Sequence, residues 1–435
     1  MTESERERPT FAQAAKVWVL VGLWSFGGSA GQIATMHRLL VEKHKWVEES
    51  RFLHALNFCM LLPGPEAQQL ATYLGWLLHR TRGGLVAGLM FVVPGFVFMM
   101  GMAGLYVGYR HLPTVDALFY GLKPAVLAVV VAALARIGRR ALSRPYLVAI
   151  AVAALIGIFF FGLPFPAIML AAGLLGYGVS RFAQSPAPAG TGGDEPAGPP
   201  SLWRGVAVAA PWLALWLVPV ALLQLAGGAY GEIALFFSKL AVVGFGGAYA
   251  MLAYVAQQAV SVHHWLAPGE MLNGLGLAET TPGPLVLVNQ FVGFLAGYRD
   301  PGALSPWLGG IAGAVVTVWA TFAPTFLWVF VGAPYAEVLR RDAVLSGALA
   351  AITAAVVGVM LNLALWFALH VMFAHVGALR YGPLNLPWPD WSGFDPLAAM
   401  LAVFAMVAMM RFRLGMIPVL TAAAATGLVL KLALG

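Results

Sequence analysis

Long apolar stretches constrain this chain more than any other feature. They recur from Val17 to Leu434, and at roughly 18 to 25 residues each is about long enough to cross a hydrocarbon core of about 30 Å. Of the 435 residues, 60% are hydrophobic and only 10% are charged, which is not the composition of a water-soluble domain. The chain is therefore predicted to be an all-α polytopic membrane protein.

The charged residues exclude several classes of function. The formal net charge is +7, but the basic residues lie in short clusters between apolar stretches, so nucleic-acid binding is not expected. A single cysteine, Cys59, allows neither an intramolecular disulfide nor a cysteine-based metal cluster. We expect no metal and no cofactor. The polar segment Met1 to Arg8 is not followed by a signal-peptide cleavage pattern, so the first apolar stretch is expected to be retained.

The chain contains an internal repeat. Phe-Gly-Gly occurs at 26–28 and again at 245–247, and Pro-Gly-Pro occurs at 63–65 and again at 282–284. Both pairs have the same offset of 219 residues, which becomes 226 further along the chain. Two motifs at one spacing indicate a duplicated unit. The first offset also relates Val41 to Val260, His44 to His263, Trp46 to Trp265, Leu53 to Leu272, and Leu56 to Leu275.

Each repeat is predicted to hold about six membrane segments, and one further span joins the repeats, which gives about thirteen in all. We divide the chain into a first repeat (1–181), a flexible Pro/Gly-rich linker (182–202), a linking span (203–226) and a second repeat (227–435). The predicted segments are 14–36, 52–79, 83–108, 115–135, 145–161 and 165–180 in the first repeat, and 232–255, 270–298, 308–333, 343–370, 394–410 and 414–434 in the second.

The linking span predicts inverted repeats. Six crossings return the chain to its starting side, so a seventh makes the second repeat begin on the opposite side. With a cytoplasmic N-terminus, most arginine-rich loops, including the one with Arg340 and Arg341, are also cytoplasmic, as the positive-inside rule requires. The loop from His375 to Pro389 carries little net charge and is expected to be external. Loop 38–51 is basic yet predicted to be external. It is either an interfacial amphipathic segment or a sign that 52–79 is re-entrant, and the same alternative stays open for 270–298.

The Pro-Gly-Pro motifs predict discontinuous helices. Two prolines remove backbone donors, so neither motif fits a regular helix, and a break at membrane depth is tolerated where it is buried in protein or lines a cavity. Pro65 and Pro284 are expected at the first position of a new helix, whose free amides attract anions. Glycines of the Phe-Gly-Gly motifs allow close approach of a ligand. Paired interruptions are typical of transporter binding sites, although the same residues can simply kink helices for packing.

The candidate substrate-binding residues come from these motifs and the polar residues around them. They are Phe26, Gly27, Gly28, Ser29, Pro63, Gly64, Pro65, Gln68, Gln69, Lys123, Lys239, Phe245, Gly246, Gly247, Thr280, Thr281, Pro282, Gly283, Pro284 and Asn289.

Ionisable residues within apolar segments are costly and usually functional. Glu66 and Glu279 are candidates for proton coupling, although Glu66 could simply cap a helix. Lys123 and Lys239 could balance a divalent anion or instead extend their side chains to the membrane interface. His44 and His263 lie beside tryptophans, which favours interface anchoring over pH sensing.

The sequence resembles the chromate ion transporter family in its long form with two homologous domains. The resemblance is carried by VGLWSFGG and LLPGPEAQQLATYLG in the first repeat and by VGFGGAYAML and TPGPLVLVNQFVGF in the second. It covers nearly the whole chain apart from 182–202, and it implies chromate efflux driven by the proton motive force, with sulfate as a structural analogue. Ser29 stands where the family has proline and Ala248 where a third glycine is usual, and these departures bear on the substrate.

The resemblance and the repeat together predict a secondary active transporter. We expect a multi-pass protein of the bacterial inner membrane that exports chromate by alternating access, coupled to protons as an antiporter. The alternatives are a transporter of sulfate or another small anion, and a structural or lipid-handling membrane protein. The chain lacks nucleophile, metal and nucleotide-loop motifs, so no enzyme activity is expected. The expected partners are an oxyanion, a proton or another coupling ion, and lipid, and a homodimer is left open.

Overall fold

The computed structural model describes residues 9–182, 202–333 and 343–434. The chain divides into two compact units: unit 1 comprises 1–101, 180–251 and 281–346, and unit 2 comprises 102–179, 252–280 and 347–435. Each unit takes segments from both sequence repeats. The expectations for the N-terminal eight residues, for nearly all of the linker and for the arginines at 340 and 341 lie outside the described residues.

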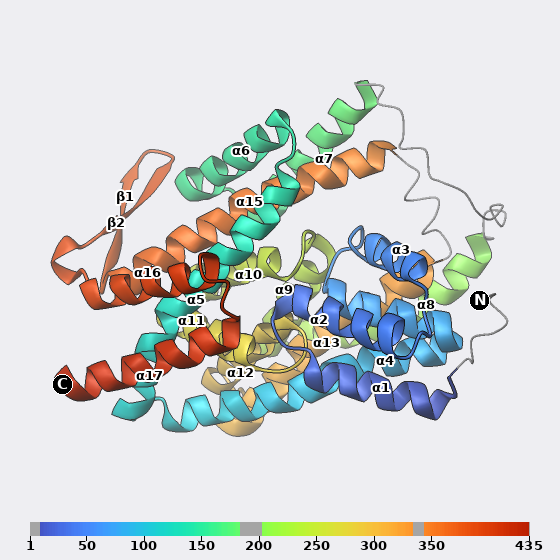
Figure 1. The fold of residues 1–435 in the computed structure, drawn as a ribbon, viewed down its shortest axis with the longest axis horizontal. Helices are drawn as coiled ribbons and strands as arrows, with labels where there is room; N and C mark the ends of the chain where they lie inside the picture. The colour runs from blue at the N-terminus through green and yellow to red at the C-terminus, as the bar shows by residue number, and fades with distance from the viewer. Residues whose placement is uncertain (1–8, 183–201, 334–342, 435) are drawn as a thin grey trace. The chain divides into compact units, whose positions relative to one another are not determined.

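Unit 1 is built from helices of very different lengths (Figure 1). The helix α13 is central to its second-repeat part, because it packs against α8, α9 and α12. The elements are α1 (Phe11–Trp24), α2 (Gly28–His37), η2 (Arg38–Lys43), α3 (Glu49–Cys59), most of α4 (Glu66–Tyr109), α8 (Leu202–Ala226), α9 (Ala229–Val243), the start of α10 (Ala248–Gln257), η4 (Leu285–Leu287), α12 (Val288–Arg299) and α13 (Pro306–Gly332).

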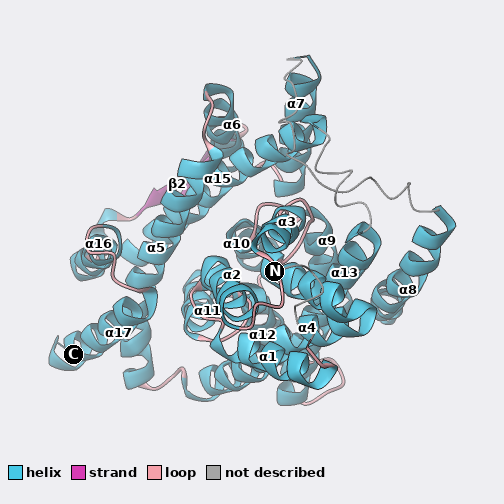
Figure 2. Ribbon diagram, turned by 45° about the vertical axis from the view of Figure 1, so that its right-hand side comes forward, coloured by secondary structure: helices cyan, strands magenta, loops and turns pink. Residues whose placement is uncertain are grey.

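Unit 2 is mainly a group of long helices in which α5 packs against α11, α16 and α17. Its one sheet within the described residues is an antiparallel hairpin that pairs Val376 with Pro389 (Figure 2). The elements are α5 (Pro113–Ala141), α6 (Pro145–Phe161), α7 (Phe165–Phe182), η3 (Gln258–Val262), α11 (Pro268–Thr280), α15 (Ala343–Met372), β1 (Val376–Tyr381), β2 (Leu384–Pro389), η6 (Trp391–Gly393), α16 (Pro396–Met410) and α17 (Met416–Leu434).

Glycines allow neighbouring helices to pack closely. Within unit 1, a Cβ on Gly309 would lie 2.6 Å from Pro301 Cβ, and one on Gly313 would lie 3.2 Å from Gly297 Cα. Within unit 2, a Cβ on Gly176 would lie 2.5 Å from Ala351 Cβ, where α7 crosses α15. Since lipid is as apolar as the helices, close van der Waals packing of this kind is what holds membrane helices together.

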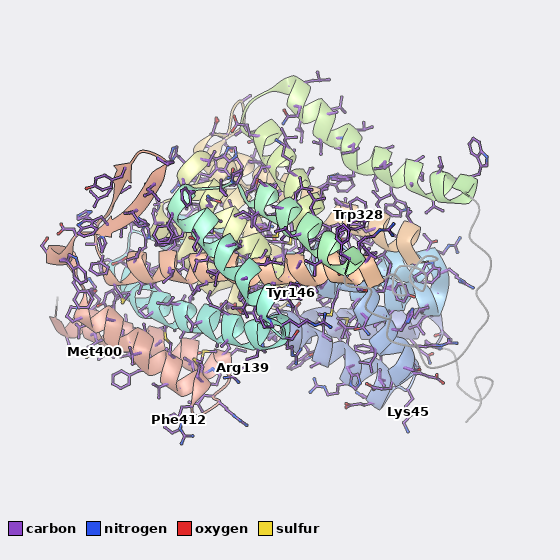
Figure 3. The ribbon with its side chains drawn as sticks, turned by 90° about the horizontal axis from the view of Figure 1, so that it is seen from above. Lys45, Arg139, Tyr146, Trp328, Met400 and Phe412 are labelled. Atoms are coloured by element: carbon purple, nitrogen blue, oxygen red, sulfur yellow. The ribbon has the colours of Figure 1, made fainter. Side chains whose placement is uncertain are left out.

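The chain is a repeat-containing all-α membrane protein. Seven helices in the described part are long and apolar enough to cross a membrane, and three shorter helices are also apolar. Large apolar side chains point away from the protein. Met400 and Phe412, at the edge of unit 2 in Figure 3, are 49% and 69% exposed. Such surfaces fit a lipid environment.

The structure corrects three details of the sequence prediction. Segments 14–36 and 232–255 are each two helices, because the Phe-Gly-Gly motifs also interrupt them. Pro65 and Pro284 precede the first helical position instead of occupying it, since α4 begins at Glu66 and η4 at Leu285. The residues after His375, predicted to be an external loop, form the hairpin of β1 and β2.

The duplication extends to local backbone geometry. In each repeat a short helix continues into a π-helix, 38–43 in the first and 258–262 in the second. The non-glycine residues Lys45 and His264, which are 219 positions apart, both have positive φ, 53° and 52°. The rings of His44 and Trp46 stack at 4.6 Å, and those of His263 and Trp265 stack at 4.3 Å. Matching irregularities of this kind support a common origin for the two repeats.

Candidate functional site

The four interrupted segments all place glycine in the left-handed backbone region. In the Phe-Gly-Gly turns, Gly27 and Gly246 have φ of 89° and 83°, and in the Pro-Gly-Pro breaks, Gly64 and Gly283 have φ of 112° and 90°. A side chain at these positions would strain the backbone, which explains the choice of glycine. All four interruptions belong to unit 1.

Reciprocal backbone hydrogen bonds join the interruptions of one repeat to those of the other. The amide of Gly64 donates to the carbonyl of Gly244 at 2.9 Å, and the amide of Gly283 donates to the carbonyl of Ser25 at 3.0 Å. Ser25 and Gly244 directly precede the two Phe-Gly-Gly motifs. The two bonds are equivalent under the 219-residue offset, so each Pro-Gly-Pro break is tied to the Phe-Gly-Gly turn of the opposite repeat.

Side chains add further links between the turns. The amide nitrogen Nε2 of Gln32 on α2 donates to the carbonyl of Gly283 at 2.7 Å. A Cβ on Gly28 would lie 3.6 Å from the hydroxyl of Tyr249 on α10. The substrate-binding candidates in the four motifs are therefore brought together from both repeats.

Glu66 is the charged residue at this meeting point. It is the first residue of α4, and its Oε1 lies 3.1 Å from the position that a Cβ on Gly247 would occupy. The carboxyl group of the first repeat thus lies against the Phe-Gly-Gly turn of the second. The first amides of a helix have no partner within the helix, and a carboxylate at this end is favoured by them.

Buried side-chain amides lie on the two helices that follow the breaks. Gln68 and Gln69 on α4, and Asn289 and Gln290 on α12, are each at most 1% exposed. Among the described residues, Oε1 of each glutamine and both polar atoms of the Asn289 side chain lack a hydrogen-bond partner. Buried polar atoms in proteins are nearly always paired, so these atoms are available to a ligand or to water.

Two threonines on α13 belong to the same group, and sequence reasoning did not identify them. Thr321 and Thr325 are each 1% exposed, and neither hydroxyl has a partner within the described residues. Thr325 Oγ1 lies 3.8 Å from the position that a Cβ on Gly64 would occupy. The available signal was the four-residue spacing of Thr317, Thr321 and Thr325, which places them on one helix face.

The structure does not bring every candidate residue to the breaks. Lys239 is exposed on α9. Lys123 belongs to unit 2 and is described with that unit. Glu279, Thr280 and Thr281 directly precede the second Pro-Gly-Pro break in the chain, and Glu279 and Thr281 are buried. None of the buried polar side chains in the described residues is lysine, arginine or histidine. The breaks and the residues next to them in the chain thus combine backbone and side-chain amides, hydroxyl groups and the carboxyl groups of Glu66 and Glu279.

Comparisons with known proteins identify the family of the chain. The model of the family described as "Chromate transporter" matches residues 12–177 and 231–428, one stretch in each repeat. The chain belongs to the chromate transporter family. The matched stretches include all four interrupted motifs, and they leave out the linker and the linking span.

Named relatives extend over most of the chain. A chromate transport protein from Pseudomonas aeruginosa is 30% identical over 82% of this chain and 81% of its own length. One from Cupriavidus metallidurans is 26% identical over 80% of this chain and 82% of its own. No solved structure matches the chain significantly. The predicted family and the predicted multi-pass membrane character are both confirmed.

Proposed function

We propose that this protein exports chromate across a bacterial inner membrane, coupled to protons, with the anion bound at the four interruptions of unit 1. The reciprocal bonds from Gly64 to Gly244 and from Gly283 to Ser25 carry the proposal. They bring together helix ends, Phe-Gly-Gly turns and unpaired polar groups from both repeats. The family and its named relatives support chromate as the substrate.

Backbone amides supply most of the proposed anion recognition. The first-turn amides of α4 and of η4 follow the two Pro-Gly-Pro breaks, and such amides bind tetrahedral oxyanions. The side-chain nitrogen Nδ2 of Asn289 and the hydroxyl of Thr325, both without a partner in the described residues, add neutral donors. These groups recognise charge and size, so sulfate is the alternative substrate of the same site.

Proton coupling follows from charge. A dianion at these amides would face the Glu66 carboxylate without a buried cation among the described residues of unit 1 to offset it. Protonating Glu66 removes that repulsion and frees the helix end that the carboxylate otherwise occupies. In this scheme, chromate binding therefore favours protonated Glu66.

Because binding of chromate favours protonated Glu66, we propose that a proton moves in the same direction as the anion. The proton and the anion occupy the site together, whereas the antiport expected above requires them to alternate. One proton carried with a dianion still moves one negative charge outward. An inside-negative potential of 100 mV drives such a charge with about 2.3 kcal/mol, so the membrane potential still favours export.

Alternating access supplies the proposed conformational step. Each reciprocal bond joins one Pro-Gly-Pro break to one Phe-Gly-Gly turn of the other repeat. Opening either pair alone would expose the site from one direction, and repeated elements of this kind suit a symmetric exchange of two states.

Flux of radiolabelled chromate from proteoliposomes tests the proposal. Wild type is compared with Glu66→Gln and Gly283→Leu, at equal folded protein, with acid inside or outside the vesicles. We expect faster wild-type efflux with acid inside, efflux in Glu66→Gln that ignores pH, and no efflux in Gly283→Leu. Acceleration by acid outside would instead favour antiport.

The same assay separates the remaining alternatives. Transport of sulfate without chromate would reassign the substrate and keep the site. A structural or lipid-handling protein would show no flux of either anion, and substitutions at Glu66 and Thr281 would change nothing. That outcome would reject the proposed function.

A further inference from the structure

A large cavity lies in unit 2, and none of the four interrupted motifs contributes to its lining. Its volume is about 700 Å³, and its lining includes Tyr120 and Lys123 of α5, the start of α11 at Pro268, His370 of α15, and Asp395 beside the start of α16. The proposed function gives no role to this space. Every lining residue belongs to unit 2.

Lys123 supplies a positive charge to this cavity. The side chain is half-buried, and Nζ lies 3.4 Å from the position that a Cβ on Gly269 would occupy. Lys123 is absent from the ion pairs formed by the described residues, which include that of Arg110 with Glu270, although the charge of Asp116 on the same helix acts on it. A half-buried ammonium group with no carboxylate in direct contact favours an anion nearby.

The acidic residue of the cavity is already bonded. The carboxylate of Asp395 accepts the Tyr120 hydroxyl at 2.8 Å and the amide of Ala398 at 2.9 Å, as the N-cap of α16. Nζ of Lys431 lies 5.1 Å from the centre of the Tyr120 ring. The group therefore has the two lysines Lys123 and Lys431 and the two aspartates Asp116 and Asp395, and the charge of Asp395 is spread over several hydrogen bonds.

Two helices begin at the cavity, and both carry partial positive charge at that end. They are α11, of 13 residues, and α16, of 15 residues. The first-turn amide of Gly269 is next to Lys123, which adds a directional donor to the lysine charge. Lysine and helix-end amides together form the pattern that binds phosphate-like groups.

Aromatic residues next to the cavity indicate its depth. Trp388 and Trp391, in the hairpin and in the turn that follows it, are 57% and 69% exposed. Exposed tryptophans of membrane proteins concentrate at the level of the lipid headgroups. Both a dissolved oxyanion and the phosphate of a headgroup reach this level.

We infer that the Lys123 cavity binds a tetrahedral oxyanion, either free or as the phosphate of a lipid headgroup. This site shares no residue with the four interrupted motifs and does not rest on the proposed function. The chemistry is the same for both sources: a dispersed negative charge accepted by an ammonium group and by helix-end amides.

Equilibrium binding of radiolabelled sulfate to the delipidated full-length protein in a neutral detergent tests this inference. Wild type is compared with Lys123→Gln and with Lys123→Arg, which keeps the charge. Lys239→Gln is the matched control, because it removes an exposed lysine of unit 1. Equal elution and melting profiles establish that the variants are folded.

We expect Lys123→Gln to bind one sulfate fewer per chain than wild type, or to bind that sulfate at least about tenfold more weakly. Lys123→Arg and Lys239→Gln are expected to match wild type. This difference of one bound sulfate per chain is expected whether or not the four interruptions also bind sulfate. Equal binding by wild type and Lys123→Gln would overturn the inference.

Added lipid distinguishes the two sources. If phosphatidylglycerol displaces the Lys123-dependent sulfate and phosphatidylcholine does not, the natural ligand is an anionic headgroup. If neither lipid displaces it, the ligand is a free oxyanion. Both results support an oxyanion site at Lys123.

Discussion

The amide of Gly64 donates a hydrogen bond of 2.9 Å to the carbonyl of Gly244, across 180 positions of sequence. The equivalent bond, from Gly283 to Ser25 at 3.0 Å, has its donor 219 positions later and its acceptor 219 positions earlier in the sequence. Each repeat thus supplies one donor break and one acceptor turn. The two repeats complete each other at this point, because each break finds its partner in the opposite repeat.

The hydroxyl of Thr325 provides a test of ligand binding that separates function from folding. Replacing Thr325 by valine keeps the shape and removes a buried hydroxyl that has no partner among the described residues. We expect stability to be unchanged or slightly raised, and chromate affinity to fall about three- to tenfold, the equivalent of a hydrogen bond of about 1 kcal/mol. Thermal melting and concentration-dependent flux measure the two quantities.

Thr317→Val is the control for that experiment. Thr317 lies two turns earlier on the same helix, but its hydroxyl donates to the carbonyl of Gly313 at 2.8 Å. Its replacement should leave chromate affinity unchanged. Equal losses of affinity in both variants would show that Thr325 acts only through helix packing.

Gly297 should be essential for stability, because α12 and α13 approach each other at this residue. A Cβ there would lie 3.2 Å from Gly313 Cα and would also meet the backbone of Gly309. We expect Gly297→Ala to destabilise the protein by about 1–3 kcal/mol through overpacking. The midpoint of thermal unfolding in detergent measures the effect.

Gly101→Ala is the matched substitution in open space. Gly101 is a helical glycine of α4 with no heavy atom within 4 Å of an added Cβ. Alanine there should stabilise the helix by about 0.5–1 kcal/mol. A fall in melting temperature of equal size for both glycines would contradict the packing argument.

His44, in the loop between η2 and α3, should make stability depend on acid. Burial, and then the charge of Lys43, lower the pKa of His44 below its usual 6.5. The unfolded chain therefore binds this proton more readily than the folded chain. The contribution of His44 to stability is complete above about pH 6.5 and decreases as the pH falls below it.

Melting temperatures at pH 7.5 and pH 5.5 test this expectation. The difference between the two should be larger for wild type than for His44→Gln, which cannot be protonated. An identical difference in the two proteins would show that the His44 proton is not linked to folding.

The sequence predicts the breaks well, because proline and glycine act locally. Two prolines that flank a glycine, as at Gly64, strongly disfavour a continuous helix. The hairpin after His375 was less predictable, because Pro383, Pro387 and Pro389 argue against strands. The two strands are stabilised by pairing with each other, and β2 also packs against α6.

The side-chain members of the site could be predicted only in part. Threonines in membrane helices usually bond to their own backbone, so sequence does not distinguish Thr325 from Thr317. Lysines pose a similar problem. Lys123 and Lys239 both interrupt apolar segments, but packing exposes Lys239 and places Lys123 at a cavity. Such differences depend on tertiary contacts.

Chromate flux in Gly64→Ala and Gly283→Ala, beside Gly302→Ala, tests the central claim most directly. All three glycines have positive φ, but an added Cβ lies 3.2 Å from Gln69 Nε2 at Gly64, 3.2 Å from Gly95 Cα at Gly283, and near nothing at Gly302. If the Pro-Gly-Pro breaks and the Phe-Gly-Gly turns of the opposite repeats form the substrate site, Gly64→Ala and Gly283→Ala lose chromate flux by at least about tenfold, which corresponds to a rise in the transport barrier of about 1.4 kcal/mol. Gly302→Ala is expected to transport like wild type. Wild-type flux in Gly64→Ala and Gly283→Ala would contradict the account.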